Sequence, residues 1–105
     1  MGKVIVVGAG PAGMMAAGKA AENGNEVHIF ERNSIVGKKI YITGKGRCNV
    51  TNDSDVENFI NNIPNNPCFL YSALYGFTSE DTIRFFNSLG VETKVERGNR
   101  VFPVS

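Results

Sequence analysis

The first thirty residues carry an apolar run, a glycine turn, a run of small residues and a second apolar run, in that order. The continuous apolar run predicts a parallel strand over Lys3–Val7 with both faces covered. The small residues predict a helix from about Pro11 to Asn23 that lies close to the sheet and ends at Gly24. Glu26–Phe30 predicts a second strand. Together these elements form a βαβ unit, so the expected fold class is α/β.

The pattern changes after the second strand, first to a polar loop and then to short amphipathic segments. The loop covers residues 33–52 and is rich in glycine, lysine and asparagine. A short apolar piece inside it, Ile40–Ile42, can belong to a helix that starts near Val36. Helical spacing and β-branched runs then predict helices over residues 53–63, 69–75 and 78–89, and a C-terminal hairpin with strands over 91–96 and 100–104.

The composition is that of an ordinary globular chain, with 105 residues of which 42% are hydrophobic and 20% charged. The net charge of +1 gives no reason to expect a nucleic acid or an anionic membrane as partner. No apolar run is long enough to span a membrane, and no targeting segment is recognisable. We therefore expect a cytoplasmic protein.

Side chains that often carry redox or metal chemistry are sparse. Cys48 and Cys68 form neither a CxxC pair nor a zinc ligand set, so we expect packed free thiols and no metal site. The single histidine, His28, is expected to be a strand residue. Aromatic residues at helical spacing are expected to serve in packing rather than in a substrate site, namely Tyr71, Tyr75, Phe77, Phe85 and Phe86.

The glycine turn has the spacing of a dinucleotide-binding fingerprint, Gly8-Ala9-Gly10-Pro11-Ala12-Gly13. Its first glycine permits a tight turn, its second lets the backbone approach a pyrophosphate, and its third lets helix and strand pack closely. The start of the helix offers N–H groups to phosphates. Glu31, which follows the second strand, can bind ribose hydroxyls and would repel a 2′-phosphate. The pattern predicts an adenine dinucleotide, and the alternative is a tight turn without a ligand.

The spacing beyond the turn favours FAD over NAD. The FAD-binding variant of the motif continues with two small or apolar positions and a glycine, which Ala17, Ala20 and Gly24 provide. Val27 and Ile29 then complete the series that leads to Glu31.

The loop carries a longer and more specific pattern. Glu31-Arg32-Asn33 is followed by Gly37-Lys38-Lys39 and by the run Thr43-Gly44-Lys45-Gly46-Arg47-Cys48-Asn49-Val50-Thr51-Asn52. Together with the tail Gly98–Ser105, this run resembles the BaiN/RdsA-type NAD(P)/FAD-dependent flavoproteins, the aminoacetone-oxidase-like family. The resemblance implies the N-terminal part of a Rossmann-like FAD-binding domain. Its implied cofactor-binding positions are Gly8, Ala9, Gly10, Pro11, Ala12, Gly13, Glu31, Arg32, Lys38, Lys39, Thr43, Gly44, Gly46, Arg47, Cys48 and Asn49.

Two interpretations stay open for the polar residues of this run. Arg47 can pair with a phosphate or with a carboxylate of the protein. Asn49 and Asn52 can contact the edge of a flavin or bond the backbone of their own loop. No residue is identified as catalytic.

The resemblance also implies a function. Members of the family have several domains, so residues 1–105 are expected to be the N-terminal part of an FAD/NAD(P)-binding domain in a longer flavoprotein. In such an enzyme NAD(P)H reduces FAD, which then reduces a small organic substrate or oxygen. The alternatives are a non-catalytic nucleotide-binding module that senses NAD or ADP, and an isolated fragment without activity that associates with itself through exposed sheet edges.

Overall fold

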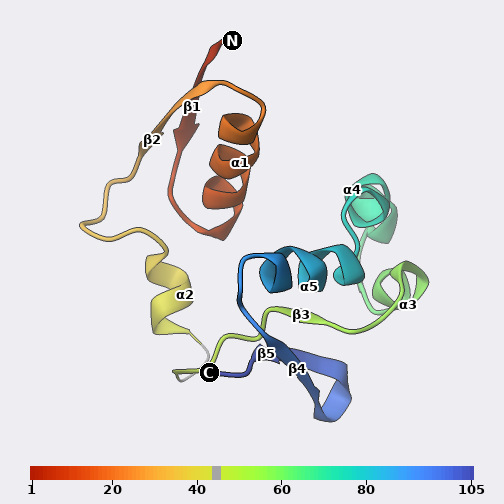
Figure 1. Ribbon diagram of the computed structural model, residues 1–105. Helices are drawn as coiled ribbons and strands as arrows, with labels where there is room; N and C mark the ends of the chain where they lie inside the picture. Colours follow the sequence, from red (N-terminus) through yellow and green to blue (C-terminus); the bar gives the residue numbers. More distant parts are fainter. Residues whose placement is uncertain (44–45) are drawn as a thin grey trace. The chain divides into compact units, whose positions relative to one another are not determined.

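The computed structural model describes residues 1–43 and 46–105, which form two compact units (Figure 1). The first unit is Met1–Gly46 and the second is Arg47–Ser105. Gly44, one of the predicted cofactor-binding residues, lies outside the described residues. The helices of the described residues include none that is long and apolar enough to cross a membrane.

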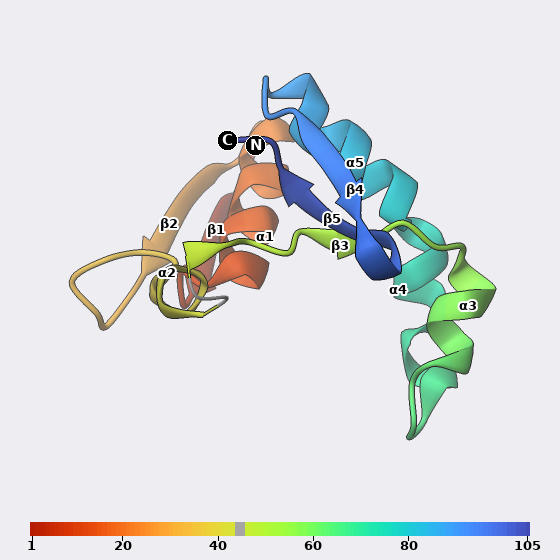
Figure 2. The same ribbon diagram turned by 90° about the horizontal axis from the view of Figure 1, so that it is seen from below.

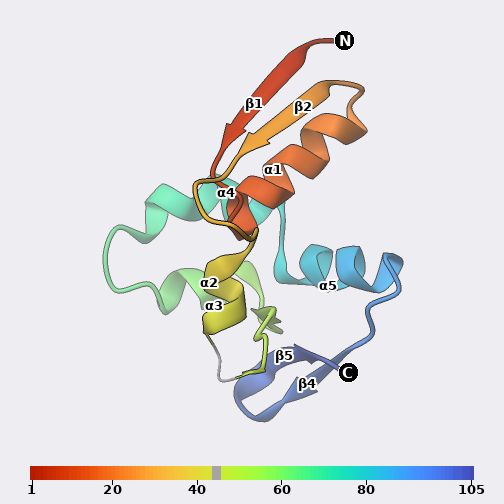
Figure 3. The same cartoon turned by 90° about the vertical axis from the view of Figure 1, so that its left-hand side faces the viewer.

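The first unit is the predicted βαβ unit. Strands β1 (Lys3–Val7) and β2 (Glu26–Phe30) run parallel, with Lys3 opposite Glu26 and Val7 opposite Phe30. Helix α1 (Pro11–Glu22) connects them and packs along one face of the pair (Figure 3). Proline occupies the start of α1, where a missing N–H costs nothing. A short helix, α2 (Lys38–Ile42), follows after the loop. The two strands have the predicted bounds, and α1 ends one residue earlier than predicted.

The opposite face of this sheet is exposed, which corrects the expectation that β1 is covered on both faces. Ile5 is 60% exposed, Val7 86% and Phe30 60%. A single helix covers the pair of strands, so the side chains that alternate away from it remain open. Within the described residues, β1 is therefore covered on one face, although its sequence is continuously apolar.

The second unit is a small antiparallel sheet with short helices. Strand β5 (Arg100–Pro103) lies between β3 (Thr51–Asn52) and β4 (Thr93–Glu96) (Figure 2). Its residues Val101 and Phe102 are buried, as is Val56. The remaining elements are the helices α3 (Val56–Asn61), α4 (Tyr71–Gly76) and α5 (Ser79–Ser88) and the 3-10 turns η2 (Pro67–Leu70) and η3 (Arg97–Asn99). The predicted hairpin is present, and β3 is an additional strand.

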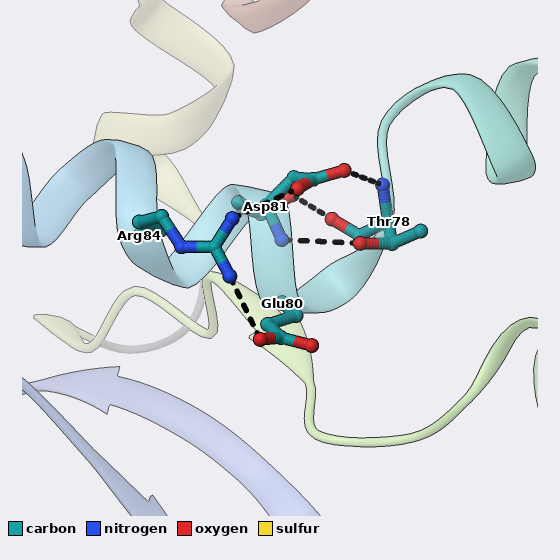
Figure 4. A network of polar contacts seen from close by, with 5 residues as sticks. Thr78, Glu80, Asp81 and Arg84 are labelled. Atoms are coloured by element: carbon teal, nitrogen blue, oxygen red, sulfur yellow. Dashed lines mark hydrogen bonds and ion pairs between the residues drawn. The ribbon is translucent and has the colours of Figure 1, made fainter.

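The start of α5 is fixed by a reciprocal pair of hydrogen bonds between Thr78 and Asp81 (Figure 4). The Asp81 N–H donates to Thr78 Oγ1 at 3.1 Å, and the Thr78 N–H donates to Asp81 Oδ2 at 2.9 Å. Arg84 adds ion pairs one turn later, at 2.7 Å to Glu80 and 3.4 Å to Asp81. The backbone N–H of Thr78 holds the pKa of the Asp81 carboxyl below its usual range. These contacts satisfy N–H groups that a helix leaves unpaired at its start.

The expected environment of the cysteines is wrong, because Cys48 and Cys68 are both exposed. The aromatic residues do pack against one another, with ring centroids 4.7 Å apart for Tyr71 and Tyr75 and 5.2 Å apart for Phe85 and Phe86. Even so, Tyr71 and Tyr75 remain about half exposed. The expected packing between rings is thus present, and it does not bury the two tyrosines.

Candidate nucleotide site

The glycine turn between β1 and α1 extends the strand pairing by one backbone bond and then bonds to a side chain. The Gly8 N–H donates to the Phe30 carbonyl at 2.8 Å, and the Ala9 N–H donates to Glu31 Oε1 at 2.8 Å. Gly8 has a φ of +100°, which a residue with a side chain rarely adopts. After Ala9 the chain leaves the sheet and enters the first turn of α1. The predicted tight turn is confirmed.

The third glycine of the motif lets α1 lie against the turn. A Cβ atom at Gly13 would lie 2.0 Å from the Gly8 carbonyl oxygen and 3.4 Å from Val6 Cγ1. The distance to Val6 is an ordinary contact, but no side chain fits 2.0 Å from a backbone oxygen, so only glycine permits this approach. The predicted reason for Gly13 is therefore confirmed by the geometry.

The middle glycine has no such role in the fold. Gly10 has a φ of −78°, which any residue adopts, and a Cβ atom there would meet none of the described atoms within 4 Å. It precedes α1, whose start has no capping side chain. The first N–H groups of a helix lack partners within the helix, and Pro11 has no N–H. The start of α1 thus presents backbone N–H donors at the positive end of the helix dipole, where a phosphate can bind.

The Glu31 carboxylate is hydrogen-bonded to the glycine turn that precedes α1. Its Oε1 accepts the Ala9 N–H at 2.8 Å, and its Oε2 accepts the Asn33 N–H at 2.8 Å. These two backbone donors, that of Ala9 first, hold the pKa of the Glu31 carboxyl below its usual range. The carboxylate is therefore ionised at neutral pH. Each of its oxygens keeps acceptor capacity for a further donor such as a ribose hydroxyl.

The segment after Glu31 folds back to the same turn. The Gly37 N–H donates to the Ala9 carbonyl at 2.7 Å, so α2 begins beside the glycine turn. The residues that follow on α2 include the predicted Lys38 and Lys39, which are exposed, as is Arg32. Thr43 ends α2, where its hydroxyl donates to the Lys39 carbonyl at 2.8 Å. Sequence reasoning left Gly37 out of the site residues, although the glycine before two lysines was a usable signal.

Arg47 is bound within the second unit by a carboxylate. Its Nη2 lies 2.6 Å from Glu96 Oε2, and its guanidinium carbon lies 3.9 Å from the centre of the Phe102 ring. The hydrogen bond from Arg47 holds the pKa of the Glu96 carboxyl below its usual range. Of the two interpretations of Arg47, the described contacts match pairing with a carboxylate of the protein.

The asparagines of the same run also bond to the chain itself. Asn49 Nδ2 donates to the carbonyls of Thr51 at 2.9 Å and Val101 at 3.1 Å. Asn52 Nδ2 donates to the Gly98 carbonyl at 2.9 Å. These bonds attach the run to the central strand and to the turn of the hairpin. The described members of the predicted set thus fall in two units, those up to Gly46 in the first and Arg47, Cys48 and Asn49 in the second.

A parallel βαβ unit, a glycine turn that opens at a helix start and an acid at the end of the second strand define a Rossmann-type nucleotide-binding domain. The chain belongs to the family of HI0933-like proteins, since residues 2–105 match the model of the HI0933-like protein Rossmann domain. This finding confirms the resemblance to the BaiN/RdsA-type flavoproteins that the loop pattern indicated.

Individual relatives carry the names of different enzymes, two of them a reductase and a dehydrogenase. The chain is 36% identical to a 3-dehydro-bile acid delta(4,6)-reductase of Clostridium scindens, over all of this chain and 25% of that protein. It is 39% identical to a ribosomal RNA dihydrouridine synthase of Escherichia coli, over 83% of this chain and 21% of that protein. A stretch of 43 residues is 51% identical to an N,N-dimethylglycine/sarcosine dehydrogenase of Chromohalobacter salexigens, covering 41% of this chain and 6% of that protein. The chain spans about a quarter of the length of the curated relatives that it matches over most of its residues.

Proposed function

We propose that this chain binds FAD, with the pyrophosphate at the start of α1 and the adenosine ribose at Glu31. The observation that carries the proposal is the open position at Gly10, where the fold has space for a side chain and the sequence has none. A glycine that the fold does not require is explained by a ligand that approaches the backbone there. The uncapped start of α1 and the ionised Glu31 supply matching partners for a phosphate and for ribose hydroxyls.

The wider proposal is that the chain is the N-terminal part of an FAD-dependent oxidoreductase. The relatives are named for substrates as different as a bile acid, ribosomal RNA and dimethylglycine. Because chemically unrelated substrates accompany a shared domain, the domain serves the cofactor rather than the choice of substrate. Bound FAD supplies hydride transfer, with NAD(P)H as the reductant and a small molecule as the substrate. The residues of this chain bind and orient FAD, and the proposal assigns none of them to the chemical step.

Titration of the full chain with FAD, followed by flavin fluorescence, tests the binding. We expect Gly10→Ala to weaken FAD binding by about tenfold or more, because the new methyl group occupies the space of the pyrophosphate. The matched control is Gly18→Ala in the middle of α1, where a Cβ atom also meets nothing within 4 Å. This control should leave FAD affinity unchanged. Equal affinities for both variants and the wild type would contradict the proposed site.

Parallel calorimetry with FAD, NAD and ADP separates the proposal from its competitors. A preference for FAD supports a flavoprotein, whereas tighter binding of NAD or ADP would point to a nucleotide sensor. A chain that binds none of the three and forms oligomers in the ultracentrifuge would match a fragment without activity.

A further inference from the structure

We propose that Glu31 and Gly37 hold the peptide groups of Ala9 between them and so fix the phosphate-binding turn before a nucleotide arrives. We call this pair of contacts the Ala9 clasp. In this proposal Glu31 is a positioning residue for the pyrophosphate in addition to its contact with ribose. The inference rests on the proposed function, because the turn that the clasp positions is the proposed pyrophosphate site.

The clasp satisfies both polar groups of a buried residue. Ala9 is 0% exposed, its N–H donates to Glu31 Oε1 at 2.8 Å, and its carbonyl accepts the Gly37 N–H at 2.7 Å. Ala9 stands between Gly8 and Gly10, and glycines leave a backbone free to adopt many conformations. The two contacts therefore restrict the backbone conformation of the turn, which its glycines alone do not restrict. They also commit the Ala9 N–H to the protein, which leaves the donors from Gly10 onward for a phosphate.

The conformation of Gly37 is one that glycine adopts without strain and that residues with a side chain rarely adopt. Its φ is +64°, and a Cβ atom there would lie 3.2 Å from Met14 Cε on α1. This conformation turns the chain so that its N–H faces the Ala9 carbonyl and Lys38 follows at the start of α2. The clasp thus ties the loop after β2 to the turn after β1, and it places a lysine directly after the tie.

The clasp and simple electrostatics predict opposite effects of removing Glu31 on the affinity for pyrophosphate. Glu31 carries a negative charge beside the proposed phosphate site, so removal of that charge should strengthen the binding of an anion. If Glu31 positions the turn, its removal should instead weaken the binding of pyrophosphate, although pyrophosphate has no ribose. Inorganic pyrophosphate is therefore the ligand that separates a positioning role from a contact with ribose alone.

The test is calorimetry of the full chain with inorganic pyrophosphate and with ADP. We expect Glu31→Ala and Gly37→Ala to weaken both ligands by about tenfold, and Glu31→Gln, which keeps one carbonyl acceptor, to have a smaller effect. The matched control is Gly90→Ala, because Gly90 has a φ of +86°, meets none of the described atoms within 4 Å and lies beyond the end of α5. It should carry the same backbone strain and keep both affinities.

Amide hydrogen exchange in the absence of nucleotide gives a readout that does not depend on ligand binding. We expect the Ala9 amide to exchange faster in Glu31→Ala and Gly37→Ala than in the wild type and in Gly90→Ala. Unchanged exchange at Ala9, or pyrophosphate affinity that is unchanged or higher in the Glu31 variants, would overturn the positioning role and leave the proposed FAD site intact. A wild-type chain that binds neither FAD, ADP nor pyrophosphate would overturn the proposed function and the positioning role together.

Discussion

Gly13 is the residue on which the close contact between α1 and the glycine turn depends. A Cβ atom there would lie 2.0 Å from the Gly8 carbonyl oxygen, which is backbone and cannot rotate away. We expect Gly13→Ala to lower the free energy of unfolding by about 2–3 kcal/mol. Gly18→Ala should raise it by about 0.5–1 kcal/mol, because the site is open and alanine favours the helix. Urea denaturation of both variants measures the difference, and equal values would contradict the close-packing role.

Glu31 makes the stability of the first unit depend on pH. Because hydrogen bonds lower the pKa of its carboxyl in the folded state, the stabilisation is complete above the usual pKa of about 4.3 and is lost as the pH falls through the lowered value. Glu31→Gln should therefore be less stable than the wild type near neutral pH, and the gap should close as the pH falls below the lowered pKa of the Glu31 carboxyl. Urea denaturation across this range measures the gap. A gap of the same size at low pH would show that ionisation of Glu31 does not stabilise the fold.

A matched control for this titration is Glu22→Gln. Glu22 is exposed and pairs only loosely with Lys19, at 3.9 Å, so its replacement should change stability little at any pH. A pH dependence shared by both variants would reflect the general loss of negative charge rather than the bonds of Glu31.

Single positions differ in how far the sequence reveals them. The place of Glu31 follows from the motif, yet its bond to Ala9 joins residues 22 positions apart and depends on how the strands pair. The partner of Arg47 is 49 positions away, and no local pattern selects Glu96 over a phosphate. The exposure of Cys48 and Cys68 depends on which elements cover them, which residue type alone does not determine. The sequence thus shows which chemistry a residue can perform, whereas its bonding partners are known only from the fold.

At the scale of elements, the start of α5 offers a direct test of a helix signal. Thr78→Ala removes the oxygen that accepts the Asp81 N–H, so we expect a loss of about 1 kcal/mol in the free energy of unfolding. Thr82→Ala is the matched control, because among the described residues its hydroxyl bonds to one group, the Thr78 carbonyl at the start of the same helix. That change should be neutral or slightly stabilising, since alanine is the better helix former. Similar losses in both variants would contradict the capping role.

Elements with local signals were predicted well and those set by distant pairing were not. β1 and β2 have the predicted bounds because apolar runs and a glycine turn delimit them. β3 has two residues, Thr51 and Asn52, and is a strand only because Val101 and Arg100 lie opposite them. Two residues are too few to show a period, so the sequence predicted a loop there. The capping pattern of α5, by contrast, lies within four consecutive residues and was recognisable.

At the scale of the whole molecule, the run from Arg47 to Asn52 acquires a structural meaning. Its arginine and asparagines bond to Glu96, Val101 and Gly98, all in or beside the C-terminal hairpin. The two most specific parts of the sequence pattern, this run and the tail, are therefore partners in one small sheet. The bonds between them explain why the run and the tail occur together in the family pattern, without a contact to FAD. The glycine turn is therefore the part of the proposed FAD site with the stronger structural evidence.

The exposed face of the first unit gives a prediction for the state of the chain in solution. Ile5 and Val7 are 60% and 86% exposed and lie on the same side of β1. Adjacent exposed apolar side chains on a strand favour association between copies. We expect the double substitution Ile5→Thr and Val7→Thr to lower the average mass at high concentration in the ultracentrifuge. The free energy of unfolding should change by less than about 0.5 kcal/mol per site, because neither side chain is buried. An unchanged mass distribution would show that this face does not mediate association, and a large loss of stability would show that it is covered in solution.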